Sequence, residues 1–410
     1  MMSIFTKIIT ALILAFVILG SAYVSMILSA AWLPTPTGFV AFSVAFSLAL
    51  GLLFARILFG SFRKPRVLRN ALIGSASISL MWGLLLIGWI FRPLQGTNPS
   101  TPQEQTEAQH ITVQGLHLAL RHYTPDSVAF PFTVVYLHPG PGNFGTENTS
   151  VDRLMRALAS YGMQGLVYDR PGEGLSQRLE DPSGYTPELQ LQVLDALLRG
   201  LPTGKAVLLG DSYGARLGVR YAAAHPGRVA GLVLLSPGPL YTNPWDPFKV
   251  SLYTRLSQDQ KKEVNKLRTN ARILTAHLLS QRNALAGRRF LPDAEADPYF
   301  SSMFRELSPG GLCDPNDTNY AYGNCGFWSS LWTDRREYGD TIAVPVLRDS
   351  IPALALRGTC DYLPERVMRP YFRVLPFLKA ELLMDRGHLM VHEDPEGLAA
   401  RIAIFLGEGK

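Results

Sequence analysis

Three long uncharged stretches dominate the first quarter of the chain. They cover residues 8–33, 38–55 and 71–91. About 20 apolar residues, each rising 1.5 Å, match a hydrocarbon core roughly 30 Å thick. Because lipid offers the backbone no hydrogen-bond partner, each stretch is predicted to be a membrane-spanning helix, within a membrane domain of residues 1–92. A cleaved signal peptide is the alternative for the first stretch, but its apolar part is too long and two more stretches follow.

The two short connections between these stretches differ in charge. Residues 60–70 carry four basic side chains, whereas residues 34–37 carry none. Short loops rich in lysine and arginine stay in the cytoplasm. The pattern therefore predicts a multi-pass integral membrane protein with a cytoplasmic amino terminus. Everything after Arg92 is then expected on the periplasmic or extracellular side.

The hydrophobic pattern changes after residues 93–110, a polar segment predicted to be a flexible linker. Short continuous apolar runs then alternate with helical patterns, and the clearest runs are residues 132–137, 165–168, 206–209, 232–235, 353–356 and 381–384. Buried strands separated by helices are typical of a parallel sheet covered on both faces. The region is therefore predicted to be an α/β domain.

The alternation of strands and helices stops between residues 241 and 345. This segment holds helical stretches, turns rich in proline and glycine, and nearly balanced charge. It is predicted to be a helical lid inserted into an α/β core. The core is then formed by residues 111–240 and 346–410.

Composition and charge narrow the choice of function. The chain is 47% hydrophobic and 18% charged. Charged residues usually make up roughly a quarter of a globular protein. Residues 1–92 hold seven basic and no acidic side chains, and the remaining residues are nearly neutral. A nucleic-acid-binding protein would concentrate positive charge on its folded domain, so a nucleic-acid partner is not expected.

The segment Gly210-Asp211-Ser212-Tyr213-Gly214 is the first candidate for chemistry. It follows an apolar run directly and precedes a helical pattern, which is the context that gives Gly-x-Ser-x-Gly a meaning. Ser212 is the predicted nucleophile, and an ordinary tight turn is the alternative.

Two later strands end in the partners that a serine nucleophile needs. Asp361 and His388 each lie just past a strand, and the order Ser, Asp, His is the one this kind of sheet uses. His392 is the less favoured alternative to His388, and a loop-capping role is the alternative for Asp361.

The segment His138-Pro139-Gly140-Pro141-Gly142 follows another strand. Proline has no N–H, so the Gly140 amide is the donor that this turn can offer. Together with the Tyr213 amide it would form a two-donor oxyanion hole. A simple turn is the alternative. No group of histidines and cysteines has metal-ligand spacing, and neither a cofactor nor a metal is expected.

These segments together resemble the α/β-hydrolases, and among them the prolyl aminopeptidases (proline iminopeptidases). Residues 138–142 stand where that branch has His-Gly-Gly-Pro-Gly, residues 169–176 look like Asp-x-Arg-Gly-x-Gly-x-Ser, and residues 210–214 match the nucleophile elbow. The resemblance covers about residues 111–405. Two positions depart from the branch, which has Gly at Pro139 and commonly Trp at Tyr213.

The resemblance implies an α/β-hydrolase fold with a helical lid and a Ser212, Asp361, His388 triad. It also implies Gly140 and Tyr213 as the oxyanion hole. Lid carboxylates grip the substrate's free amine in that branch, and the candidates here are Glu263, Glu295, Glu306 and Glu337.

Three functions are weighed for this chain. The first is a membrane-anchored serine hydrolase, an aminopeptidase of the prolyl-aminopeptidase type, acting on small peptides through an acyl-enzyme. The second is an esterase or lipase of the same fold, acting on acyl esters near the bilayer in which the helices are anchored. The third is a binding protein without catalysis.

Two of the three cysteines lie close together in the lid. Cys313 and Cys325 are 12 positions apart in a segment without helical pattern. A disulfide between them is the hypothesis, since an external domain permits one. Cys360 is expected to be a small buried residue.

Overall fold

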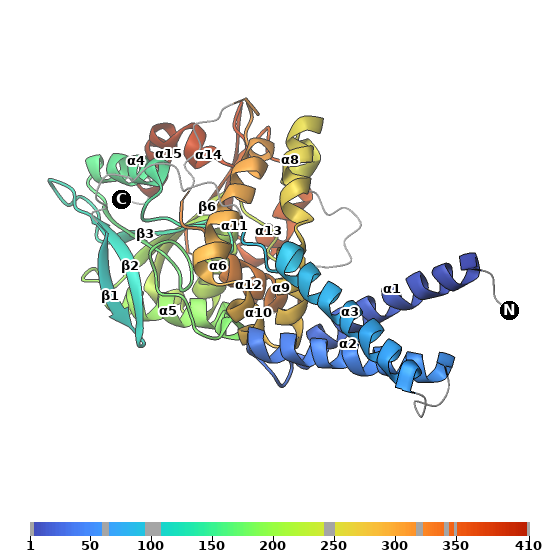
Figure 1. Cartoon of the computed structure of the whole chain (residues 1–410). Helices are drawn as coiled ribbons and strands as arrows, with labels where there is room; N and C mark the ends of the chain where they lie inside the picture. The colour runs from blue at the N-terminus through green and yellow to red at the C-terminus, as the bar shows by residue number, and fades with distance from the viewer. Residues whose placement is uncertain are drawn as a thin grey trace. The chain divides into compact units, whose positions relative to one another are not determined.

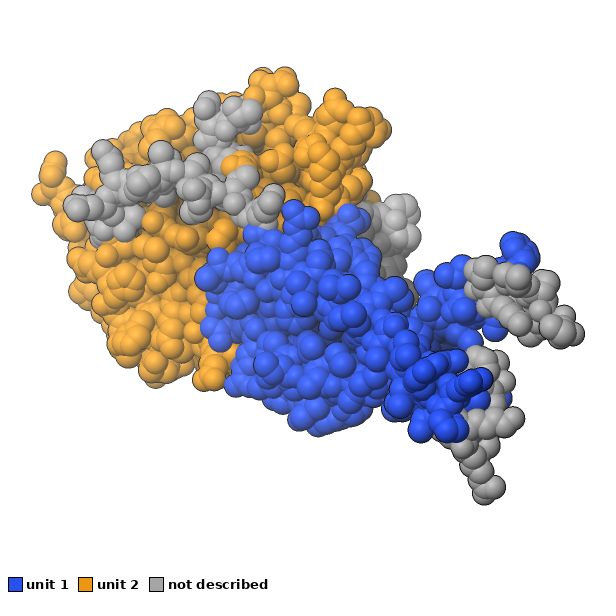
Figure 2. Space-filling model, in the orientation of Figure 1, with its two compact units in different colours: residues 1–94, 268–295 blue, residues 95–267, 296–410 orange. Residues whose placement is uncertain are grey.

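The chain divides into two compact units, which Figure 2 colours separately. The first combines residues 1–94 with residues 268–295, and the second combines residues 95–267 with residues 296–410. A computed structural model describes residues 4–59, 65–94, 108–241, 251–316, 323–339, 344–347 and 351–407. Most of the predicted linker, residues 93–110, lies outside the described residues.

Three helices make up most of the first unit, and their bounds are α1 (Ile4–Ser29), α2 (Pro36–Phe59) and α3 (Pro65–Leu85), the last extended by the π-helix η1 (Leu86–Ile90). All three are long and apolar enough to cross a membrane, as the hydrophobic pattern predicts. Helices pack in lipid through small residues and polar contacts. Helices α2 and α3 do so, because the Oγ atoms of Ser47 and Ser79 lie 2.8 Å apart and Trp82 Nε1 donates to Ser43 Oγ at 3.0 Å.

The first unit also contains two helices from the predicted lid, α9 (Ala271–Arg282) and α10 (Ala284–Phe290). The hydroxyls of Tyr23 in α1 and Thr275 in α9 lie 3.0 Å apart. Near them, Arg272 forms a two-pronged ion pair with Glu295, with both distances 2.7 Å. The structure therefore groups residues 268–295 with α1, α2 and α3, whereas the hydrophobic pattern alone assigns them to the lid.

An eight-stranded sheet forms the centre of the second unit (Figure 1). Its order is β1-β2-β4-β3-β5-β6-β7-β8, antiparallel from β1 to β4 and parallel from β4 to β8. The strands are β1 (Gln109–Val113), β2 (Leu116–Tyr123), β3 (Thr133–Leu137), β4 (Gln164–Tyr168), β5 (Ala206–Asp211), β6 (Val229–Leu235), β7 (Ala353–Gly358) and β8 (Leu378–Leu383). The predicted α/β sheet is confirmed.

Helices cover the sheet and form the lid. Those of the core are α4 (Thr149–Ser160), α5 (Pro187–Arg199), α6 (Tyr213–Ala224), α13 (Arg369–Val374), α14 (Met390–Glu393) and α15 (Pro395–Gly407). Those between β6 and β7 in the second unit are α7 (Leu252–Arg255), α8 (Gln258–Arg268), α11 (Asp293–Leu307) and α12 (Phe327–Gly339). Short 3₁₀ turns are η2 (Pro182–Gly184), η3 (Pro226–Arg228), η4 (Ser308–Gly311) and η5 (Glu365–Met368).

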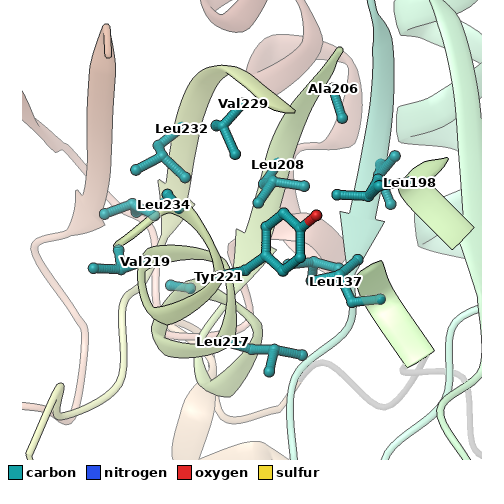
Figure 3. Packing of buried hydrophobic residues seen from close by; sticks show 14 of the residues in the cluster. Leu137, Leu198, Ala206, Leu208, Leu217, Val219, Tyr221, Val229, Leu232 and Leu234 are labelled. Carbon is teal, nitrogen blue, oxygen red and sulfur yellow. The ribbon is translucent and has the colours of Figure 1, made fainter. Parts of the chain in front are cut away.

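Both faces of the sheet are buried in hydrophobic cores. Successive side chains point to opposite faces, so Leu208 packs in one core cluster while Val207 and Leu209 pack in another. Figure 3 shows the first cluster, in which Leu217 and Tyr221 of α6 lie with Leu208. Helices α5 and α6 cover this face, and α4 and α15 cover the other. This two-sided burial holds the carboxyl ends of the parallel strands in place.

Candidate active site

Ser212 stands on a sharp turn between β5 and α6. Its backbone has φ 51° and ψ −106°, a strained conformation for a residue with a side chain. The flanking glycines are required by close packing. A Cβ on Gly210 would lie 2.5 Å from the backbone of Ala215, and one on Gly214 would lie 1.9 Å from the Leu137 carbonyl oxygen.

Two side chains from other strand ends reach Ser212. His388, which follows β8, places Nε2 2.9 Å from Ser212 Oγ. Its other ring nitrogen, Nδ1, lies 2.9 Å from Oδ1 of Asp361, which follows β7. The Leu363 amide also donates to Asp361 Oδ1, at 2.9 Å. The structure thus brings together the three side chains that the sequence selects, whereas His392 lies beside Ser150.

The electrostatics of these groups follow from burial and mutual charge. Burial lowers the pKa of His388, but the charge and hydrogen bond of Asp361 outweigh it, so the pKa is raised. Burial raises the pKa of Asp361, but the His388 charge and two hydrogen bonds leave it below the usual value. Burial also raises the pKa of Asp211, which accepts from the Tyr136 hydroxyl, to about 6.

The backbone amides of Gly140 and Tyr213 are the predicted oxyanion donors. Gly140 has φ +131°, and Tyr213 is the first residue of α6, where amides have no carbonyl partner within the helix. Within the described part of the chain, neither amide donates to a protein acceptor. Both residues line the same cavity as Ser212.

A buried ion pair braces the loop that carries Gly140. Arg170 donates from Nη1 to the His138 carbonyl at 2.6 Å and from Nη2 to the Pro139 carbonyl at 2.7 Å. Its Nε donates to Glu173 at 2.9 Å, and the other Glu173 oxygen accepts from the Gly142 amide at 2.7 Å. Arg170 and Glu173 are 1% and 0% exposed, so this pair is inside the protein. The sequence motif at residues 169–176 contains both Arg170 and Glu173, but it did not predict that they brace this loop.

Comparison with known proteins agrees with this geometry. A family model described as the alpha/beta hydrolase fold matches residues 133–301. A 2-hydroxy-6-oxononadienedioate/2-hydroxy-6-oxononatrienedioate hydrolase of Burkholderia vietnamiensis is 30% identical over 265 residues, which are 55% of this chain and 91% of that protein. The chain belongs to the α/β-hydrolase family.

Other relatives of this α/β-hydrolase carry different names. A proline iminopeptidase of Heyndrickxia coagulans is 21% identical over 304 residues, which are 72% of this chain and 97% of that protein. Among solved structures, the epoxide hydrolase CorEH shares the fold with a TM-score of 0.51 at 13% identity, covering 75% of this chain and 100% of that one. The names of these relatives give different substrates, so they do not select one for this chain.

The hydrolase has a cavity of about 630 Å³ beside Ser212 and His388. One wall is apolar and comes largely from α11, with Phe300, Met303, Phe304 and Leu307. The rest of the lining is mixed, and its polar side chains include Asn143, Ser330, Asp334 and Arg366. A partly apolar substrate therefore fits the space next to the serine.

Glu337 of α12 lies in the wall of this cavity and is held by three side chains. It accepts from Arg220 Nη1 at 2.7 Å and from Arg216 Nη1 at 3.2 Å. The Tyr213 hydroxyl lies 3.1 Å from its Oε1. The sequence gives Glu337 as one of four lid candidates and misses both arginines, although their spacing of four on α6 places them on one face.

The other three candidates for gripping a free amine do not line the cavity. Glu263 is exposed on α8, 2.6 Å from Lys266, and Glu306 lies 3.7 Å from Arg305. Glu295 pairs with Arg272 inside the first unit.

The cysteine pairing of this hydrolase differs from the expected one. Cys313 is bonded to Cys360, and Cys325 is a buried free thiol whose pKa burial raises to about 12. The reason is that the lid segment before Cys313 runs beside the histidine loop, where the Gly311 carbonyl accepts from the His388 amide at 2.7 Å. This contact brings the Cα atoms of Cys313 and Cys360 to 5.1 Å. The prediction of a Cys313–Cys325 bridge is wrong.

Removing this bridge should destabilise the second unit. It closes a loop of 47 positions, and a loop of that size adds about 2–4 kcal/mol by restricting the unfolded chain. Chemical unfolding of a Cys313→Ala/Cys360→Ala double variant measures the loss. Cys325→Ala is the matched control, and an equal loss there would contradict the assignment.

Proposed function

We propose that this α/β-hydrolase is a serine hydrolase that cleaves carboxylic esters through an acyl-enzyme. The observation that carries the proposal is the unbroken hydrogen-bonded chain from Ser212 Oγ through His388 to Asp361, at 2.9 Å for each step. Ser212 attacks the ester carbonyl while His388 accepts its proton through Nε2. Asp361 fixes the tautomer of His388 and stabilises the imidazolium.

The remaining steps use the same groups. The amides of Gly140 and Tyr213 hold the oxyanion of the tetrahedral intermediate. Its collapse expels the alcohol, which takes the proton from His388. Water, deprotonated by His388, then attacks the acyl-enzyme. Collapse of this second tetrahedral intermediate breaks the Ser212 Oγ–acyl bond and releases the acid, while His388 returns the proton to Ser212.

The surroundings of Ser212 favour an ester over a peptide with a free amine. An ammonium group needs a carboxylate that is not already neutralised. Among the described residues two carboxylates line the cavity: Glu337 is already paired with Arg216 and Arg220, and Asp334 shares the lining with the cation Arg366. The apolar wall of α11 instead supplies a surface for an acyl chain.

An aminopeptidase of the prolyl type is the second candidate. It is supported by relatives named proline iminopeptidase, such as the one from Heyndrickxia coagulans, and by one from Saccharolobus solfataricus that is 36% identical over 104 residues. That match covers 25% of this chain and 32% of that protein.

An activity panel on the full-length protein in detergent or lipid nanodiscs tests the proposal. It compares p-nitrophenyl esters of increasing chain length, prolyl-, alanyl- and leucyl-naphthylamides, and 2-hydroxy-6-oxononadienedioate. Ester turnover that falls at least about 10⁴-fold in Ser212→Ala is expected. Turnover of the naphthylamides alone would select the aminopeptidase. Turnover of the dienedioate alone would select a hydrolase of carbon–carbon bonds. Ester turnover that survives Ser212→Ala would overturn the mechanism.

We also propose that the second unit lies outside the cytoplasm. The basic residues of the second connection support a cytoplasmic location for that loop, and the Cys313–Cys360 bridge supports an oxidising compartment for the hydrolase. Fusions of alkaline phosphatase and of green fluorescent protein to residue 410 test the orientation. An active phosphatase with a dark fluorescent protein is expected, and the reverse would contradict it.

A further inference from the structure

Arg216 is a buried cation in the wall of the cavity that holds Ser212. It lies four residues after Ser212 on α6, about one helical turn along the axis. Its side chain lines the same cavity as Ser212 and His388 although the residue is 6% exposed. A charged group placed so deep beside a nucleophile needs an explanation.

The hydrogen bonds of Arg216 leave part of the guanidinium unused. Nη1 donates to Glu337 Oε2 at 3.2 Å, and the group lies over the Tyr213 ring, 4.8 Å from its centroid. Its Nε is buried without a hydrogen-bond partner among the described residues. A guanidinium offers five N–H donors in a planar fork, and leaving a buried donor unpaired costs stability.

The charges around Arg216 do not balance. Glu337 is shared by two arginines and lies closer to Arg220, at 2.7 Å, than to Arg216. The other charged pair that lines the cavity, Arg366 and Asp334, has opposite signs. Arg216, Arg220 and Glu337 together therefore carry one net positive charge, and Arg216 is the cation of this cluster that lines the cavity, beside Glu337.

We propose that Arg216 forms a carboxylate-binding subsite, so that the substrate is an ester carrying a second, anionic carboxylate. The inference rests on the proposed ester hydrolysis and names its substrate class. A carboxylate in the cavity pairs with the part of the guanidinium that lines it and neutralises the surplus charge. The apolar wall of α11 then covers the carbon chain between the ester and this carboxylate.

Binding without turnover tests the subsite independently of the reaction. Calorimetry measures monomethyl adipate and, as the neutral match, dimethyl adipate on the full-length Ser212→Ala protein. We expect the acid to bind at least about tenfold more tightly than the diester, because an Arg–carboxylate pair is a strong charge-assisted contact. Adding Arg216→Gln should remove this difference, and equal affinity of the two ligands for Ser212→Ala would overturn the inference.

Two further variants separate loss of the subsite from loss of structure. Arg216→Gln leaves the 2.7 Å pair of Arg220 and Glu337 in place, so the fold should survive, and thermal unfolding checks it. Arg220→Gln removes the other cation of the cluster, so Glu337 then balances Arg216. The preference for the acid should therefore fall without disappearing, because Arg216 still lines the cavity. Loss of the preference in Arg220→Gln but not in Arg216→Gln would also contradict the assignment.

Kinetics on the active enzyme then distinguish this inference from the proposed function. Mono-p-nitrophenyl adipate, which carries a free carboxylate, is compared with methyl p-nitrophenyl adipate, which does not. Faster hydrolysis of the acid, expressed mainly in KM and lost in Arg216→Gln, is expected. Equal hydrolysis of the two esters would contradict the carboxylate subsite but not the esterase activity. If neither ester is hydrolysed, the proposed esterase activity is contradicted, and the calorimetry still tests the subsite.

Discussion

Replacing Asp361 with asparagine is expected to lower kcat for ester hydrolysis about 10⁴-fold, because the neutral amide no longer stabilises the imidazolium that forms when His388 takes the serine proton. The contact at stake is the 2.9 Å bond from His388 Nδ1 to Asp361. The asparagine carbonyl can still accept from the Leu363 amide, which donates to Asp361 at 2.9 Å. The loss should therefore be seen in steady-state kcat with little change in KM.

The pH profile of this variant supplies a second readout. His388 works as a base in its neutral form, so kcat/KM falls as the pH drops through its pKa. The Asp361 charge raises that pKa against the effect of burial. Removing the charge lowers it, and the acid limb of the profile should move to lower pH in Asp361→Asn.

A matched control lies in the histidine loop itself. Asp385 is exposed and has φ 54°, a conformation that asparagine tolerates. Asp385→Asn should leave both kcat and the acid limb within error of the parent. If Asp361→Asn behaves like Asp385→Asn, the third member of the triad has been misassigned.

The sheet and the meeting of Ser212, His388 and Asp361 were predictable because both follow from local sequence patterns. Continuous apolar runs indicate strands buried on both faces, and parallel strands bring their carboxyl ends to one edge. Ser212, Asp361 and His388 each lie within five positions of the end of such a run. The glycines around Ser212 mark a turn where backbone atoms leave no space for a Cβ.

The contacts around the triad were not predictable, since each joins segments that are far apart in sequence. Glu337 is 121 positions from Arg216, and Cys313 is 47 positions from Cys360. Spacing alone favours a nearby partner such as Cys325, but the path of the lid past His388 decides the pairing. Nothing in the hydrophobic pattern separates residues 268–295 from the lid either, because their polar contacts to α1 depend on single side chains such as Tyr23.

Replacing Arg170 with methionine should produce the largest loss of stability among the variants considered. The change leaves Glu173 buried without its cation and takes the donors from the carbonyls of His138 and Pro139. Breaking a buried ion pair by removing one partner costs about 3–5 kcal/mol. Urea unfolding measures the loss, and kcat should fall as well because the loop that positions Gly140 is no longer braced.

An exposed Arg–Glu pair provides the control for this result. Arg153 and Glu396 lie 2.8 Å apart with side chains 58% and 55% exposed, and Arg153→Met should cost at most about 1 kcal/mol. A similar small cost for Arg170→Met would show that the buried pair does not support the loop.

The destabilisation by Arg170→Met should depend on pH in a definite direction. Burial raises the pKa of Glu173 while the Arg170 charge lowers it, so removing Arg170 raises the folded-state pKa further above the unfolded value. A carboxyl shifted upward binds its proton more tightly in the folded state, and stability falls as the pH rises from the unfolded toward the folded pKa. The cost of Arg170→Met should therefore be larger at pH 8 than at pH 5, whereas Arg170→Met/Glu173→Leu, which leaves no buried charge at this pair, should lose that dependence. A cost that does not change with pH in the single variant would mean that Glu173 is not the group left unpaired.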